Sequence, residues 1–241
     1  MVRRIGSETL SEKAYVAIRD SIVRNELLPN EAVSVDGLAN ELGISPTPIR
    51  EALSRLVADG LVRHEPRKGM RVAELSESDV RHTYEVRRLL EPYVARSTAQ
   101  KALGDDLLRA ELRGLEALAQ EVQSETAHVE QVSQASFQAY TRIDLRLHEL
   151  LVSSIENPIL RMLFESLGNL SLRIRSFVEA SFARCTRGSV RELNDEHLAI
   201  LRALVDGGIE DSERLTRTHL NRAEERTLRA LREAESTESV S

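Results

Sequence analysis

Apolar positions divide the chain into a short mixed segment followed by a long helical one. Over residues 9–26 and 45–60 they recur every three or four positions, which predicts two amphipathic helices. A shorter helix over residues 35–42 fits between them, with a serine before it as a cap and a glycine after it as a stop. A helix, a short helix, a tight turn and another helix follow the order of a helix-turn-helix motif.

Two short strand-like runs follow the third helix, Leu61–His64 and Met70–Ala73. They are joined by the turn EPRKG, which presents Arg67 and Lys68 at the tip of a wing. The polar surface of the third helix carries Thr47, Arg50, Ser54 and Arg55. Arginine reads guanine in a DNA major groove, and threonine or serine reaches phosphate. We therefore predict that the third helix is a recognition helix and that these six side chains contact DNA.

From residue 76 onward the pattern is helical almost throughout, with no strand-type alternation. The predicted helices cover residues 77–103, 105–123, 130–155, 158–184, 188–206 and 208–234. Pro92 is expected to kink or restart the first of them, because proline removes a backbone hydrogen bond. The predicted fold class is mainly α. An N-terminal winged helix-turn-helix (residues 1–75) is followed by an antiparallel α-helical bundle of six or seven helices (residues 76–232) and a flexible tail (residues 233–241).

Charge is distributed unevenly along the chain, which carries a net −6 at neutral pH. Residues 1–75 hold 11 Lys and Arg against 11 Asp and Glu, so the rest of the chain carries the whole acidic excess. Within residues 46–71, by contrast, six basic residues stand against three acidic ones. Taken alone, such a local excess also fits an ordinary solvated surface. Together with the helix order and the wing, it favours double-stranded operator DNA as the partner.

Several other classes of protein are disfavoured by the sequence. The single cysteine, Cys185, cannot form an internal disulfide and fits a reducing compartment. The first ten residues are charged but lack an apolar run, so they do not predict a signal peptide. No segment approaches the run of about 18 apolar residues that a membrane-spanning helix needs. We expect a cytoplasmic protein that does not associate with membranes.

The stretch LGISPTPIREALSRLVADGLV, followed by a basic turn and GMRV, resembles the winged-helix head of GntR-type bacterial transcription regulators. The resemblance covers residues 9–74 and implies DNA contacts from Thr47, Arg50 and the wing. Pro46 stands where the family often has an arginine, a position that contacts a base or phosphate in other members. Asn30 replaces the usual glycine of the turn after the first helix.

Four titratable side chains lie on the apolar faces of predicted helices. Asp144 and His148 are four residues apart, so they share one helical face, which continues through leucine and isoleucine. His197 and His219 align in the same way with apolar residues of two other helices. Burying a carboxylate without a partner costs on the order of several kcal/mol. A divalent metal would remove that cost, because the carboxylate and the neutral imidazoles would become its ligands.

Each of these residues has a simpler interpretation when taken alone. An inward histidine is more often a hydrogen-bonded core residue than a ligand, and Asp144 with His148 would also fit an ion pair on the helix surface. The joint pattern favours a metal. The same residues, with VRRLLEP upstream, resemble the helical FCD effector domain of the FadR-like branch of these regulators, over residues 76–232. That resemblance implies that Asp144, His148, His197 and His219 bind a divalent metal ion, zinc in our expectation, with nickel or manganese as alternatives.

A metal held by three neutral imidazoles and one carboxylate keeps a net positive charge, which suits a small carboxylate ligand. Arg87 lies on the inward face of its helix, where its guanidinium could hold that carboxylate bidentately. The alternative for Arg87 is an ion pair with Glu91, four residues on. Arg173 and Arg175 are further candidates for effector binding. The resemblance implies an organic or sugar acid as the effector.

Together these observations predict a homodimeric transcription regulator, a repressor in our expectation, that releases its operator when the effector binds. Three alternatives stay open: a metal sensor without an organic effector, a purely structural metal, and a metal-dependent hydrolase, since three histidines and an aspartate also build catalytic zinc sites. A hydrolase would need an inward general base. Glu149 and Glu196 adjoin the candidate ligands in sequence and are expected to point elsewhere, so we do not expect an enzyme.

Overall fold

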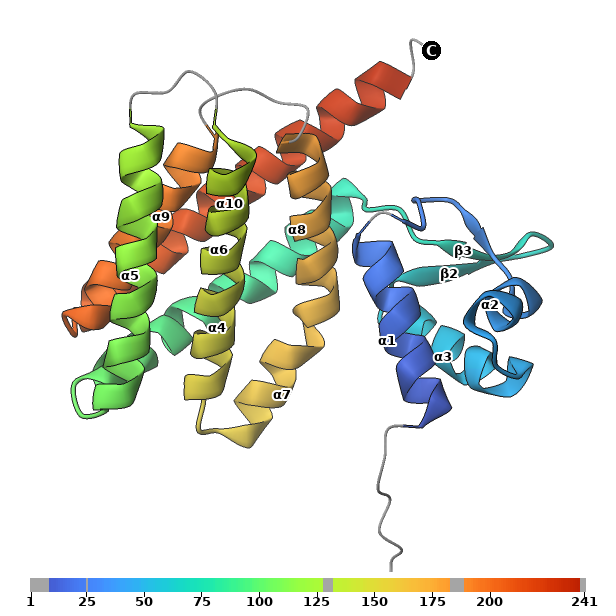
Figure 1. Ribbon diagram of the computed structural model, residues 1–241, viewed down its shortest axis with the longest axis horizontal. Coiled ribbons are helices and arrows are strands. Elements are labelled where there is room, and N and C mark those ends of the chain that lie inside the picture. Colours follow the sequence, from blue (N-terminus) through green and yellow to red (C-terminus); the bar gives the residue numbers. More distant parts are fainter. Residues whose placement is uncertain (1–8, 25, 128–131, 183–188, 239–241) are drawn as a thin grey trace, which may run out of the picture. The chain divides into compact units, whose positions relative to one another are not determined.

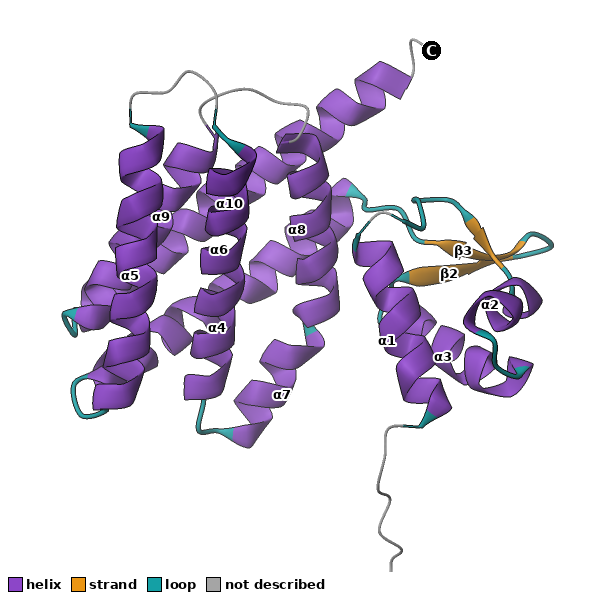
Figure 2. Cartoon of the chain, viewed as in Figure 1, coloured by secondary structure: helices purple, strands orange, loops and turns teal. Residues whose placement is uncertain are grey.

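The computed structural model describes residues 9–24, 26–127, 132–182 and 189–238, and within them the protein is mainly helical (Figures 1 and 2). It divides into two compact units. One consists of Met1–Ser76 with Ser166–Val178, and the other of Glu77–Glu165 with Glu179–Ser241. Cys185 lies outside the described residues.

The first unit begins with the predicted helix-turn-helix. Its helices are α1 (Leu10–Val23), α2 (Val35–Leu42) and α3 (Pro46–Ala58). Thr9 and Ser34 each accept a hydrogen bond from a backbone amide in the first turn of α1 and α2, respectively. Gly43 ends α2 with φ 65°, a left-handed conformation that glycine adopts without strain. Ser45 occupies the N-cap position of α3, although its side chain makes no capping hydrogen bond.

A small antiparallel sheet forms the wing (Figure 2). Its strands are β1 (Ala32–Val33), β2 (Val62–Glu65) and β3 (Gly69–Val72), in the order β1-β3-β2. The hairpin of β2 and β3 lies within one residue of the predicted runs. Strand β1 was not predicted, because two residues are too few to show any alternation. The mainly helical fold class with an N-terminal winged helix-turn-helix is thus confirmed.

Tyr15 of α1 ties the first helix to the end of the third. Its hydroxyl donates a hydrogen bond to Oδ2 of Asp59, the C-cap of α3, at 2.6 Å. The guanidinium of Arg55 lies over the Tyr15 ring, 4.1 Å from the centroid, and pairs with Glu12 of α1 at 2.5 Å. Beneath these contacts lies the apolar core of the unit, which includes Ile18, Ile49, Leu53, Leu56 and Leu61.

The helices that follow residue 76 are α4 (Glu77–Ala102), α5 (Asp106–Thr126), α6 (Gln134–Ser154), α7 (Pro158–Ser166), α8 (Gly168–Phe182), α9 (Ser189–Val205) and α10 (Ile209–Glu238). The helix predicted over 158–184 is two helices, divided at Leu167, which brings the described helices of this part to seven. Helix α10 runs on through residues 233–238, where a tail was predicted. None of the described helices is long and apolar enough to cross a membrane.

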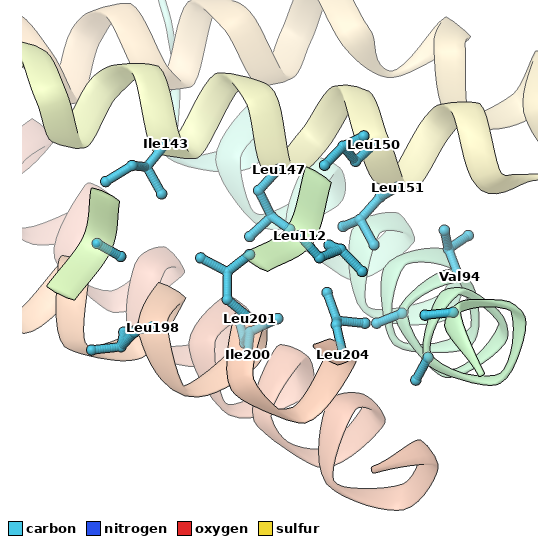
Figure 3. Packing of buried hydrophobic residues seen from close by; sticks show 14 of the residues in the cluster. Val94, Leu112, Ile143, Leu147, Leu150, Leu151, Leu198, Ile200, Leu201 and Leu204 are labelled. Carbon is cyan, nitrogen blue, oxygen red and sulfur yellow. The ribbon is translucent and has the colours of Figure 1, made fainter. Parts of the chain in front are cut away.

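Leucine dominates the core of the second unit, as the low aromatic content of 3% leads one to expect. In Figure 3, Leu112 of α5, Leu147 and Leu151 of α6, and Leu201 and Leu204 of α9 point toward a common interior. Helices α5, α6 and α9 lie against one another around these side chains, and α4 also contacts α6 and α9. The result is a packed helical bundle whose interior has little room for a polar group without a partner.

Helices α4 and α10 lie along each other in opposite directions (Figure 1). Glu77 at the start of α4 pairs with Arg232 near the end of α10 at 2.7 Å. Arg96, further along α4, pairs with Glu213 near the start of α10 at 3.2 Å. These two ion pairs establish the antiparallel arrangement.

Pro92 lies inside α4, which continues past it, so that of the two expected outcomes, a kink or a restart, the restart does not occur. A residue with an N–H at this position would donate to the carbonyl oxygen of Arg88, one turn earlier. Instead, Nη1 of Arg217 on α10 donates to that oxygen at 3.4 Å. The neighbouring helix therefore supplies the hydrogen bond that the proline removes, and the helix tolerates the proline.

We expect Tyr15→Phe to lower the free energy of unfolding by about 1–2 kcal/mol, because it removes one hydrogen bond to an ionised acceptor and leaves the ring packing intact. Chemical denaturation monitored by circular dichroism measures this change. The matched control is Tyr93→Phe, since Tyr93 is 57% exposed. Equal stability of the two variants would contradict a role for the Tyr15–Asp59 contact.

Candidate functional site

The four residues predicted as metal ligands lie in the second unit, where α4, α6, α9 and α10 meet. We call Asp144, His148, His197 and His219 the histidine cluster. Asp144 and His148 come from α6, His197 from α9 and His219 from α10. Residues His197 and His219 are 2% and 9% exposed, and the centroids of their rings lie 4.7 Å apart. The prediction that they point inward therefore matches their positions.

His197 is the most buried member of the cluster and is poorly satisfied by the protein. Its Nε2 lies 3.4 Å from Oδ1 of Asp144, longer than a good hydrogen bond. Its Nδ1 has no hydrogen-bond partner among the described residues. One face of its ring stacks on Tyr140, with centroids 5.5 Å apart. Burial, and then the nearby His219, lower the pKa of His197 to about 3, so its imidazole is neutral and available as a ligand near pH 7.

Arg87 and Glu91 of α4 form a buried ion pair beside the cluster. Nε of Arg87 lies 2.5 Å from Oε1 of Glu91, and both side chains are less than 10% exposed. Although burial acts against the charged form, Arg87 holds the pKa of Glu91 below its usual value. Nη2 of Arg87 also lies 3.4 Å from Nε2 of His148. The side chain of Arg87 thus faces inward, as predicted, and forms the ion pair with Glu91 that the sequence offered as the alternative to an effector contact.

Glu196 is a member of the site that the sequence did not predict. It was expected to point away from the metal ligands, yet its Oε2 lies 2.8 Å from Nδ1 of His219. Arg226 of α10 donates to both of its oxygens, at 2.9 and 2.8 Å. Burial opposes ionisation, but the hydrogen bonds from His219 and Arg226 lower the pKa of Glu196 to about 2. No local pattern in the sequence predicts these contacts of Glu196, because they depend on how α9 packs against α10.

The donor set fits a divalent ion in its chemistry. Three imidazoles and one carboxylate are the ligands that zinc and similar metals take, and one imidazole nitrogen of the cluster lacks a partner within the described residues. The side chains do not stand in a finished coordination shell, because no three His, Cys, Asp or Glu side chains of the described residues are placed to hold an ion. Binding would require side-chain movement, first of all by Arg87, which faces Nε2 of His148.

In the first unit, four of the predicted DNA contacts lie exposed on α3, namely Thr47, Arg50, Ser54 and Arg55. Arg67 and Lys68 are exposed between β2 and β3, with Nζ of Lys68 3.7 Å from Glu65. Arg55 differs from the others, because its guanidinium is held by Tyr15 and Glu12 as described above. This contact favours a packing role for Arg55 in the unit.

Arg173 of α8 lies in the first unit as well. Its side chain is buried and donates to the carbonyl oxygens of Gly60, at 2.8 Å, and Ala73, at 2.9 Å. These bonds join α8 to the end of α3 and to the residue after β3. Its position therefore favours a structural role over the effector contact expected from the sequence. The side chain of Arg175 lies outside the described residues.

We expect Glu91→Gln to destabilise the metal-free protein by about 3 kcal/mol, because the buried Arg87 would lose its countercharge. Thermal and chemical unfolding of chelator-treated protein measure this loss. Glu85→Gln is the matched control, since Glu85 lies on the same helix and is exposed. An effect no larger than that of the control would mean that Arg87 does not depend on Glu91.

Two family models match the chain. Residues 10–72 match the model described as bacterial regulatory proteins of the gntR family, and residues 82–222 match the FCD domain. An uncharacterised HTH-type transcriptional regulator of Agrobacterium vitis is 36% identical over 140 residues, which cover 58% of this chain and 77% of that protein. The galactonate operon transcriptional repressor of Escherichia coli is 25% identical over 217 residues. This match covers 80% of the present chain and 86% of the repressor.

A solved crystal structure of a transcriptional regulator GntR from Rhodococcus sp. RHA1 shares the fold. Its TM-score is 0.67 at 21% identity, and the match covers 90% of this chain and 97% of that one. Both matching families, and these relatives, are transcription regulators, which confirms the expectation that the chain is not an enzyme. The hydrolase alternative has no support among them. The chain belongs to the GntR family of bacterial DNA-binding transcription regulators and carries an FCD domain after its winged helix.

Proposed function

We propose that this regulator is a repressor whose FCD domain binds a divalent metal and a small carboxylate effector that together control operator binding. The observation that carries the proposal is the meeting of one carboxylate and three imidazoles from α6, α9 and α10 beside the leucine core, with His197 and His219 buried. Structural stability alone gives no reason to place four such groups there, because apolar side chains of similar size would pack without their desolvation cost.

Asp144, His148, His197 and His219 would hold the metal. When bound, the ion would supply a positive charge with exchangeable positions, to which a carboxylate is attracted. Arg87 supports the effector role from the protein side. Its guanidinium is buried at the cluster and already forms an ion pair with the carboxylate of Glu91. The surroundings therefore accommodate an arginine–carboxylate pair. Similarity to the galactonate operon transcriptional repressor supports a sugar acid as the chemical class of the effector.

The exposed positions on α3 and the wing would contact DNA. Thr47, Arg50 and Ser54 lie on the helix that a winged helix-turn-helix places in the major groove, and Arg67 and Lys68 lie at the wing tip. A homodimer would present two such helices to half-sites about 34 Å apart, one turn of DNA. Effector binding would change operator affinity only if the acid prefers one arrangement of the dimer over another.

We expect Arg50→Ala to weaken binding to a specific site by about 5- to 150-fold, the equivalent of about 1–3 kcal/mol for one base-reading arginine. The probe is a duplex selected from a random library by the wild-type protein, and the measurement is fluorescence anisotropy against that duplex and a scrambled one. Lys68→Ala should instead weaken binding to both duplexes alike, because lysine contacts the phosphate backbone. It should also reduce the slope of log affinity against log salt concentration by about 1. Arg142→Ala, exposed on α6, is the control.

If Arg50→Ala weakens binding to both duplexes equally, Arg50 contacts phosphate and does not read a base. If Arg50→Ala binds the selected duplex with wild-type affinity, Arg50 does not belong to the DNA interface. Membership of the GntR family does not depend on either result, because it rests on the match of the whole winged helix.

For the metal, we expect elemental analysis of the purified protein to find about one divalent ion per chain, since the cluster offers one full set of ligands. His148→Ala and His197→Ala should lose it, whereas His82→Ala, exposed on α4, should keep it.

In thermal shift assays, galactonate, gluconate or another small acid should raise the melting temperature of the metal-loaded protein and leave that of the chelator-treated protein unchanged.

The same samples separate the alternatives. Operator release by the metal alone would indicate a metal sensor. An ion whose removal lowers the melting temperature, with no acid having any effect on DNA binding, would indicate a structural metal. Absence of an ion after supplementation with zinc, nickel and manganese would overturn the metal-based part of the proposal and leave the DNA-binding part in place.

A further inference from the structure

Glu196 forms a bridge of charged groups between α9 and α10. Its carboxylate accepts from Nδ1 of His219 and from two nitrogens of Arg226, and its side chain is 9% exposed. Arg222 reaches the same carboxylate at 3.4 Å from the more exposed side. The bridge lines a groove of about 530 Å³ between the two helices, to which His219 also contributes. His219 thus belongs both to this groove and to the histidine cluster.

The hydrogen bond to Glu196 determines which nitrogen of His219 carries the proton. Arg226 donates to both oxygens of Glu196, so the carboxylate acts as an acceptor and Nδ1 of His219 is the donor in their contact of 2.8 Å. An imidazole binds a metal through a nitrogen that carries no proton, so donation from Nδ1 to Glu196 leaves Nε2 as the nitrogen that could bind a metal. The ring of His219 is tilted by 47° against that of His197 at a centroid distance of 4.7 Å, so the same ring takes part in the cluster.

Arg226 makes this arrangement specific. Its two nitrogens bond separate oxygens of Glu196, a bidentate geometry that fixes the plane of the carboxylate as well as its position. Without the arginine, Glu196 would be free to rotate away from His219 toward solvent in the groove. A histidine that serves as a metal ligand is commonly oriented in this way, by a carboxylate on its other ring nitrogen.

We propose that Glu196 is a positioning residue, which Arg226 holds in place and which orients His219 so that its Nε2 is presented to a metal in the histidine cluster. The metal part of this inference rests on the proposed function. The tautomer part does not, because it concerns the metal-free protein. A purely structural ion pair between α9 and α10 would account for the Arg226 contact but would leave the tautomer of His219 independent of Glu196.

The test compares the wild type with Glu196→Ala by two measurements. In the metal-stripped protein at neutral pH, long-range ¹H–¹⁵N correlation spectra report the tautomer of His219, assigned with a His219→Ala spectrum. Zinc affinity is then measured by competition with a chelator of known affinity. We expect the Nδ1–H form in the wild type, a shift toward Nε2–H in Glu196→Ala, and a loss of zinc affinity of about 10- to 100-fold. Glu192→Ala, one turn away in the same groove, is the matched control and should leave both unchanged.

A wild-type tautomer in folded Glu196→Ala, or wild-type zinc affinity, would overturn the proposal. If the wild type binds no zinc, the proposed metal function fails, and the tautomer measurement alone decides whether Glu196 orients His219. If Glu196→Ala does not fold, Glu196→Gln replaces it. That variant keeps an acceptor but removes the charge and weakens the Arg226 contact, so a smaller loss of zinc affinity is expected and no loss at all counts against the proposal.

Discussion

Burying ionisable groups inside a leucine bundle is the constraint around which the second unit is organised. Each such group needs a partner in the same confined volume, and the partners come from different helices. Arg87 meets Glu91 on α4 and faces His148 on α6, while Glu196 on α9 meets His219 and Arg226 on α10. These contacts connect α4 with α6 and α9 with α10 by bonds that have direction, which apolar packing alone does not provide. In His197, by contrast, Nδ1 has no hydrogen-bond partner among the residues that the structure describes.

The first unit depends on a smaller constraint of the same kind. A recognition helix must keep its outer surface polar and exposed, so its attachment has to come from its inner face and its end. Ile49, Leu53 and Leu56 supply the apolar attachment, and Asp59 at the C-cap receives the tyrosine of α1. Arg55 shows how a basic residue on the same helix can also serve this attachment.

Much of this architecture could be predicted because it depends on local signals. The bounds of α3 follow from a proline in its first turn and a glycine after its last, and the inward direction of the histidines follows from helical periodicity. What could not be predicted depends on neighbours distant in the chain. Glu196 and His197 are adjacent, so their side chains point about 100° apart on α9. Both nevertheless reach His219, because the facing helix lies between those two directions. The grouping of α8 with the winged helix, through Arg173, has no local signal either.

Pro92 and Arg217 have a mechanical consequence for the pair of long helices. A carbonyl freed by proline exists at one place along α4, and the guanidinium that occupies it projects from one place along α10. Sliding either helix by a single residue would displace the two groups by about 1.5 Å and separate them. Together with the ion pairs of Glu77 with Arg232 and of Arg96 with Glu213, the contact at the proline sets the axial register of the two helices, and this register fixes the position of His219, two residues beyond Arg217, along the bundle.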